Sequence, residues 1–316
     1  MFSRLTFEWK LWWKNQSFKQ KLTPLFFVSL YWSLLFFLKG FRTDHLHIGL
    51  VILFFAYTGP RTRPVFKFLL PAILTAMIYD SQRFWADYVR GPVHVEFPYW
   101  FDKTLFGVPT PEGILTPNEW FQKNTHWFLD FVTGFFYLFF IAIYVLICAY
   151  HQFFYPKIAK DPVARHKSEK LGPYLTWSFF WVNMLGYSTY YWFAAAPPWY
   201  VADHGLGPAK MDVMASPAGC IRFDELLGTH FFTGMYGRSA DVFGAIPSLH
   251  IAYPFLSVLF AFQFQSLRVF SLLFYLIMCF SAVYLNHHYV IDLIWGTAYA
   301  IFIWWCVNRY TFRSKP

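Results

Sequence analysis

The sequence has little charge for its length. Asp, Glu, Lys and Arg make up 14% of its 316 residues, against roughly 25% in an average soluble domain. Hydrophobic residues make up 57%, so there are too few charged side chains to cover the surface of a soluble fold. Intrinsic disorder is excluded too, because 41 Phe, 21 Tyr and 15 Trp provide ample apolar area to bury. The composition predicts an integral membrane protein.

The sequence also lacks paired cysteines. It has four cysteines, and none of them forms a Cys-x-x-Cys pair. Three lie in apolar runs (Cys148, Cys279 and Cys306), and Cys220 lies outside these runs. This spacing excludes a disulfide framework and a cysteine-based zinc site. We interpret all four as small hydrophobic side chains.

A cleavable signal peptide is missing as well, because no small-residue cleavage site precedes the first apolar run. Residues 1–21 instead interleave Lys and Arg with three tryptophans. This mixture is typical of a basic amphipathic segment that lies on a membrane surface. A solvated tail that contains tryptophans is the alternative.

Apolar runs recur along the chain, and a membrane-spanning helix needs about 20 mostly apolar residues. Eight stretches are candidates: 22–38, 45–58, 64–80, 127–150, 173–196, 244–264, 267–286 and 289–307. The stretch 45–58 is the weakest, and a re-entrant segment is the alternative there. We predict an all-α polytopic bundle in a single membrane domain, 1–316, with two N-terminal segments before a six-helix core at 64–310.

The basic residues predict an orientation for this bundle. If the N-terminus is cytoplasmic and all eight stretches cross, 17 of the 26 Lys and Arg residues fall on the cytoplasmic side. An excess of positive charge marks the cytoplasmic side of membrane proteins. Both termini are therefore expected in the cytoplasm, and the net charge of +9 needs no nucleic-acid partner.

Two polar motifs are expected at one membrane face, opposite the cytoplasm. The first is Phe-Gly-Ala-Ile-Pro-Ser-Leu-His at 243–250, and the second is Tyr-Leu-Asn-His-His-Tyr-Val-Ile-Asp at 284–292. His288 and Asp292 stand at i and i+4, so one helix face can carry both. The carboxylate can accept a hydrogen from one imidazole nitrogen and leave the other as a nucleophile. His250 can then protonate a leaving oxygen.

Two other interpretations of these residues stay open at this point. Histidines at helix ends often serve as structural hydrogen-bonding groups. Alternatively, four of the side chains make a plausible metal-ligand set: His250, His287, His288 and Asp292.

Pro-Ser-x-His followed by His-x-x-x-Asp resembles two motifs of the type 2 phosphatidic acid phosphatase superfamily. The resemblance implies a phosphohistidine at His288, an orienting role for Asp292, acid/base work by His250, and no metal or cofactor. The usual first motif, Lys-x6-Arg-Pro, is missing at 187–200. The usual Ser-Arg is altered as well, since Ala follows Ser281. These departures argue against a plain lipid phosphatase.

Four blocks, in order, are similar to the fungal inositol phosphorylceramide synthases. They are Ala-Ala-Pro-Pro-Trp-Tyr (195–200), Ser-Pro-Ala-Gly-Cys-Ile-Arg-Phe-Asp (216–224), the 243–250 motif and His-His-Tyr-x-x-Asp (287–292). The resemblance implies transfer of inositol phosphate from phosphatidylinositol to ceramide, with release of diacylglycerol. The active site would face the periplasm of a bacterium or the lumen of the Golgi.

Phosphodiester transfer also needs fixed cations or donors for the nonbridging oxygens. The loop 197–243 offers three cations, and Arg222 is the first choice because it lies inside a matched block. An arginine that anchors lipid headgroups at the surface is the alternative for each. The predicted substrate-binding set is Arg222, Arg238, Lys210, Ser248, Trp199, Tyr200 and His287, with the two aromatic residues shaping a lipid entrance.

Three functions remain compatible with the sequence: a lipid phosphotransferase, a phosphatase that uses water as acceptor, and a transporter or scaffold. Two local features outside the blocks are also predicted. Asp80 and Arg83 are expected to form an i,i+3 ion pair. Thr116 is expected to cap a short interfacial helix with Pro117 at its first position and Glu119 three residues on.

Overall fold

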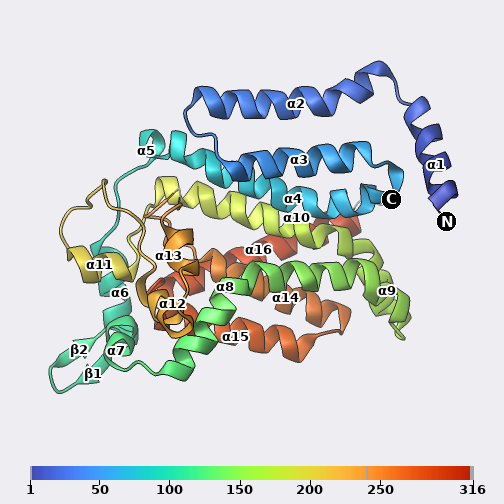
Figure 1. Ribbon diagram of the computed structural model, residues 1–316. Coiled ribbons are helices and arrows are strands. Elements are labelled where there is room, and N and C mark those ends of the chain that lie inside the picture. The colour runs from blue at the N-terminus through green and yellow to red at the C-terminus, as the bar shows by residue number, and fades with distance from the viewer. Residues whose placement is uncertain (1, 240, 314–316) are drawn as a thin grey trace. The chain divides into compact units, whose positions relative to one another are not determined.

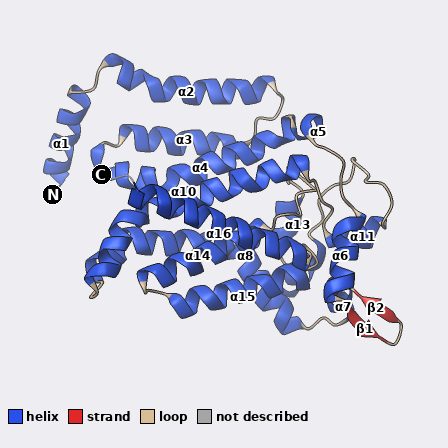
Figure 2. Cartoon of the chain, turned by 180° about the vertical axis from the view of Figure 1, so that it is seen from behind, coloured by secondary structure: helices blue, strands red, loops and turns tan. Residues whose placement is uncertain are grey.

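The computed structural model describes residues 2–239 and 241–313, and these are mostly helical (Figures 1 and 2). The chain forms two compact units, Met1–Leu74 and Thr75–Pro316. The boundary falls inside helix α4 (Arg63–Ser81).

The first unit contains α1 (Phe2–Lys14), α2 (Phe18–Phe37), α3 (Thr43–Tyr57), the 3-10 helix Pro60–Thr62 and the start of α4. The Ser17 hydroxyl accepts the Gln20 amide while the Gln20 side chain accepts the Ser17 amide, so a capping box begins α2. The helices α2 and α3 pack against each other.

A connecting segment follows α4 in the second unit. It contains the 3-10 helix Gln82–Phe84, α5 (Ala86–Val89), α6 (Glu96–Phe106), the hairpin β1 (Val108–Thr110) and β2 (Gly113–Leu115), and α7 (Pro117–Lys123). The predicted capping box of α7 is confirmed: Thr116 Oγ1 accepts the Glu119 amide and the Thr116 amide donates to Glu119. The Arg83–Asp80 ion pair is confirmed as well.

Long helices make the core of this unit. They are α8 (Trp127–Ala149), which a π-helical turn (Tyr150–Phe154) joins to α9 (Tyr155–Ile158), then α10 (Pro162–Trp192), α14 (Leu249–Phe264), α15 (Arg268–Tyr284) and α16 (Val290–Arg313). Helix α14 contacts α8, α10, α15 and α16. Most of its side chains are buried, as expected of a helix that is apolar on every face.

Short helices connect α10 to α14. They are α11 (Pro198–His204), the 3-10 helix Ala218–Cys220, α12 (Ile221–Leu227) and α13 (Phe231–Tyr236). In Figure 1 these elements gather at one end of the long helices, where α14 and α16 begin.

Each of the eight predicted apolar stretches forms a helix, so the all-α class is confirmed. Within the described residues, three helical regions are long and apolar enough to cross a membrane: Pro60–Phe84, Trp127–Ile158 and Val290–Phe312. Three more apolar helices are shorter: Thr43–Tyr57, Leu249–Phe264 and Arg268–Tyr284. The protein is an integral membrane protein, while the count of eight spans and the single domain stay predictions.

Candidate active site

The two histidine motifs meet at one end of the helical core. His250 lies in the first turn of α14, and Asp292 lies in the first turn of α16. The Ser248 amide donates to the Asp292 carbonyl oxygen at 3.0 Å, which ties the two helix starts together. Gly296 permits this approach, because a Cβ atom there would lie 2.2 Å from the Ser248 carbonyl oxygen.

His288 is held through both ring nitrogens. Its Nδ1 atom lies 3.1 Å from Asp292 Oδ2 and 3.1 Å from the Ala245 carbonyl oxygen. Both neighbours are acceptors, so Nδ1 carries the proton and Nε2 carries the lone pair. His250 Nδ1 lies 3.1 Å from His288 Nε2, so it donates to that lone pair. The His288–Asp292 pair predicted from their spacing is therefore present.

Burial keeps His288 uncharged. The residue is 5% exposed, and burial lowers the pKa of its imidazole to about 4, because a charged ring would lose its hydration. At neutral pH the ring is neutral and Nε2 keeps its lone pair, which a nucleophile requires.

Backbone hydrogen bonds join the first three sequence blocks to one another or to the two residues just before the fourth block. They run from the Ala195 amide to the Phe243 carbonyl (2.9 Å), from the Trp199 amide to the Asn286 carbonyl (3.1 Å), and from the Gly219 amide to the Leu285 carbonyl (2.9 Å). Blocks that are separated along the chain are thus assembled around His288.

Asp102 on α6 also positions this assembly, and the sequence analysis missed it. Its carboxylate is fully buried and accepts the Val290 amide at 2.6 Å and the Ile291 amide at 3.1 Å. It therefore caps the helix that carries Asp292, from a separate element. Burial raises the pKa of the Asp102 carboxyl to about 7. The available signal was a carboxylate in the middle of a mostly apolar stretch.

Two further residues of the same connecting segment contact the motifs. The Asn118 amide donates to the carbonyl oxygens of Val283 and His288 at 2.9 and 3.0 Å. Arg90 pairs with the buried carboxylate of Asp241 at 2.9 Å, and that carboxylate accepts the Phe243 amide at 3.0 Å. Elements between α4 and α8 thus hold both histidine motifs.

Arg222 is engaged by the protein itself. Its guanidinium pairs with Asp130 at 2.6 Å, donates to Gln122 at 3.0 Å and lies over the Tyr284 ring. Arg238 and Lys210 are exposed on the connection between α10 and α14. Among the described residues, no hydrogen bond or ion pair joins these three cations to His250 or His288.

His287 occupies a structural position. Its Nε2 atom lies 3.1 Å from the Pro217 carbonyl oxygen and 3.3 Å from Cys220 Sγ. Its ring stacks between those of Tyr137 and Tyr236. Burial lowers the pKa of the ring to about 3. These contacts anchor the 216–224 block, and the substrate contact of His287 stays a prediction. Within the described chain, no three His, Cys, Asp or Glu side chains converge as metal ligands.

Trp199 and Tyr200, for which a role at the lipid entrance stays a prediction, lie inside the protein. They are 5% and 1% exposed and pack with Phe243 and Val95 in an apolar cluster. Tyr200 also accepts the Lys210 amide at 2.8 Å. Ser248 is fully buried, and its hydroxyl has no hydrogen-bond partner among the described residues.

Comparison with known proteins gives this arrangement a family. Residues 115–306 match the model of the PAP2 superfamily. The phosphoinositol dihydroceramide synthase of Bacteroides thetaiotaomicron is 32% identical over 292 residues, which are 90% of each chain. The inositol phosphorylceramide synthase catalytic subunit of Schizosaccharomyces pombe is 31% identical over 254 residues, 79% of this chain and 55% of that one. No solved structure matches significantly.

The chain therefore belongs to the PAP2 superfamily. Within it, the chain falls in the branch of the inositol phosphorylceramide synthases, which the four sequence blocks predicted. It is a lipid phosphotransferase, and the transporter or scaffold alternative is set aside.

Proposed function

We propose that this phosphotransferase moves an inositol-phosphate headgroup from phosphatidylinositol to ceramide or a related lipid alcohol and releases diacylglycerol. The observation that carries the proposal is the buried chain His250–His288–Asp292, in which His288 Nε2 carries a lone pair that accepts a hydrogen bond from His250. The names of the relatives supply the headgroup and the acceptor.

In the first step, His288 Nε2 attacks the phosphorus of the donor lipid. A nitrogen–phosphorus bond forms while the bond from phosphorus to the diacylglycerol oxygen breaks. The leaving oxygen departs opposite the attacking nitrogen, so His250 Nδ1, which lies 3.1 Å from His288 Nε2 without substrate, has to move away from that nitrogen to admit the phosphoryl group. For this step His250 is the imidazolium: it gives one ring proton to the leaving oxygen and becomes a neutral imidazole, while Asp292 stabilises the positive charge that develops on His288.

In the second step, the hydroxyl of the acceptor lipid takes the place of diacylglycerol. His250 now accepts the hydroxyl proton, an oxygen–phosphorus bond forms, and the bond to His288 Nε2 breaks. Both histidines return to their starting states. Because the acceptor is the only difference from hydrolysis, exclusion of water from the buried site favours transfer over phosphatase activity.

Donors for the nonbridging oxygens come from the start of α14 in this proposal. The Ser248 hydroxyl is buried and has no hydrogen-bond partner within residues 2–239 and 241–313, and a helix of 16 residues begins at the next residue. Free amides at a helix N-terminus bind phosphate. Arg222, Arg238 and Lys210 remain proposed contributors, and Arg222 would have to share its guanidinium with Asp130.

The site is proposed to face away from the cytoplasm, in the periplasm or the Golgi lumen. The distribution of Lys and Arg supports this orientation, with 17 of 26 on the side of the termini. The test is cysteine labelling in sealed vesicles. A membrane-impermeant maleimide is added to the vesicle face that corresponds to the outside of the cell. It should react with Glu112→Cys, at an exposed position near α7, and should not react with Lys160→Cys. The reverse pattern would place the site in the cytoplasm.

Product analysis tests the reaction. Purified protein in vesicles receives phosphatidylinositol labelled in the headgroup, with and without ceramide. We expect the label to appear in a ceramide-linked phosphodiester, with one diacylglycerol released for each transfer, and only when ceramide is present. Release of free inositol phosphate at the same rate without ceramide would identify a hydrolase and contradict the proposal. His288→Ala is the control for both reactions.

A further inference from the structure

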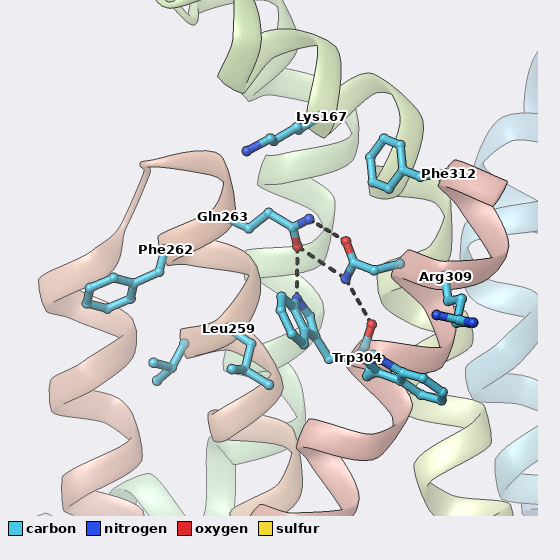
Figure 3. A pocket seen from close by; sticks show the side chains of 10 residues that line it. Lys167, Leu259, Phe262, Gln263, Trp304, Arg309 and Phe312 are labelled. Atoms are coloured by element: carbon cyan, nitrogen blue, oxygen red, sulfur yellow. Dashed lines mark hydrogen bonds between the residues drawn. The ribbon is translucent and has the colours of Figure 1, made fainter.

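A second site lies at the far end of the helical core. A cavity of about 770 Å³ opens between the last turns of α14 and α16, with Lys167 extending over it from α10 (Figure 3). His250 lies in the first turn of α14 and Gln263 lies in its last turn, 13 residues further on, so about 20 Å of helix separates these two residues. The cavity is therefore distinct from the site of phosphoryl transfer.

Hydrogen-bonded amides form one wall of this cavity. Trp304 Nε1 donates to Gln263 Oε1 at 2.9 Å, and Gln263 Nε2 donates to Asn308 Oδ1. The Asn308 amide donates in turn to the Trp304 carbonyl at 2.8 Å. These bonds fix the orientation of the Gln263 side chain. A glutamine amide has two N–H donors, and the second one is left for a ligand.

Two cations line the same cavity. They are Lys167 on α10 and Arg309 on α16, and within the described residues neither has a carboxylate at ion-pair distance. Arg309 lies over the Trp305 ring at 5.4 Å, which keeps its guanidinium beside the cavity. Two positive charges at one opening attract an anion.

The remaining walls are apolar and exposed. Phe262 is 52% exposed and Trp305 is 50% exposed, and both belong to apolar helices. In a membrane protein, exposed side chains of this kind face lipid chains. The cavity therefore joins a cationic, hydrogen-bonding end to an apolar wall, as the headgroup and chains of a phospholipid require.

We propose that this cavity binds an anionic phospholipid as a non-substrate ligand. The lipid phosphate lies between Lys167 and Arg309, and Gln263 donates to a headgroup or glycerol oxygen. The acyl chains run along the exposed aromatic wall. Basic pockets between transmembrane helices bind anionic headgroups in this way. A free phosphate ion would satisfy the cations but leave the apolar wall uncovered, so the lipid is the occupant. The proposal does not depend on the reaction at His288.

The test uses the His288→Ala protein, which prevents turnover. Native mass spectrometry measures binding of phosphatidylglycerol and of phosphatidylcholine with the same chains. We expect phosphatidylglycerol to bind more tightly and to raise the melting temperature, because a ligand stabilises the state that binds it. Lys167→Gln/Arg309→Gln should weaken phosphatidylglycerol binding by about 10- to 30-fold, since each basic residue near a lipid surface contributes roughly 1 kcal/mol.

A matched control removes the same charge nearby. Lys157 and Lys160 are exposed at the same end of the core and do not line the cavity. Lys157→Gln/Lys160→Gln should keep the affinity for phosphatidylglycerol within about twofold of that of the starting protein. This change is small compared with the roughly tenfold loss of affinity expected of the cavity variant. Equal losses in the two double variants would show general surface attraction and overturn the site, as would equal affinity for phosphatidylcholine.

Two further measurements complete the design. Lys167→Arg/Arg309→Lys keeps both charges and should retain binding, which guards against loss through misfolding. Excess inorganic phosphate should not displace the lipid. Full displacement by phosphate would identify a site for the free ion and overturn the lipid assignment.

Discussion

The two ends of the α14–α16 core treat polar groups in opposite ways. At the end that carries the histidines, His288, Asp292 and Asp102 are at most 5% exposed, and other segments supply their hydrogen bonds. At the far end, Lys167 and Arg309 line an open cavity. Burial keeps an imidazole neutral, with a lone pair available for attack, whereas a cation that is to bind an anion must stay accessible. The difference separates a site for chemistry from a site for binding.

The largest expected effect comes from the histidine end. His288→Ala should abolish transfer, because no other side chain replaces a covalent nucleophile. Asp292→Asn should lower the rate by at least about 100-fold, since the imidazole loses the carboxylate that fixes its tautomer and stabilises its charge. Product formation in vesicles measures both rates. Normal membrane insertion and melting temperature are the required controls. Retention of more than a few per cent activity by His288→Ala would contradict the assignment.

Asp102 tests whether the connecting segment positions the chemistry. Asp102→Asn replaces one acceptor of the Val290 and Ile291 amides with a donor, so α16 should shift at its first turn. A displacement of about 1 Å near a reacting group can cost about 100-fold in rate. We expect kcat to fall by 10- to 100-fold while KM changes little.

The control for Asp102 is Glu112→Gln, which removes an exposed carboxylate from the same segment. A purely structural role for Asp102 would lower the melting temperature and leave kcat of the folded fraction unchanged. That pattern would refute positioning.

The pH profile follows from the lowered pKa of His288. Only the neutral ring is a nucleophile, and burial lowers its pKa to about 4. The His288 ring therefore stays neutral as the pH falls through 6.5, the ordinary pKa of histidine. The part of the transfer rate that depends on His288 should fall only near pH 4. Initial rates between pH 4 and 8 provide the measurement. A sharp loss centred at the ordinary pKa of histidine would mean that the ring is hydrated in the working enzyme.

Arg222 should show a smaller effect, and on stability. Its partner Asp130 is buried. A buried side chain that loses its hydrogen-bonding partner lowers the free energy of unfolding by about 1–3 kcal/mol. Arg222→Gln and Asp130→Asn should lower the melting temperature to similar extents. A rise in KM for the donor lipid with Arg222→Gln alone would support the proposed phosphate contact, and an unchanged KM would confine Arg222 to its ion pair with Asp130.

Local features could be predicted from the sequence because they depend on short spacing. The pair His288 and Asp292 and the cap formed by Thr116 and Glu119 both lie within one helical turn. The meeting of the two histidine motifs was predicted as well, because the turn between α14 and α15 is short. Composition and apolar runs were enough to indicate the all-α membrane class.

Other contacts could not be predicted because they join distant segments. Asp102 lies 188 residues before Val290, and Asp130 lies 92 residues before Arg222. No local pattern encodes either pair. Trp199 illustrates a different difficulty, because an aromatic side chain suits both a membrane interface and a buried core. Only the packing around Phe243 shows which position it occupies.

Detection of the covalent intermediate tests the central claim most directly. Protein incubated with phosphatidylinositol labelled at phosphorus, without ceramide, is quenched rapidly in alkali and digested, and the labelled peptide is sequenced. The account predicts label on His288, loss of that label when ceramide is added, and no label in His288→Ala. A labelled His250, or full transfer without any labelled histidine, would contradict it.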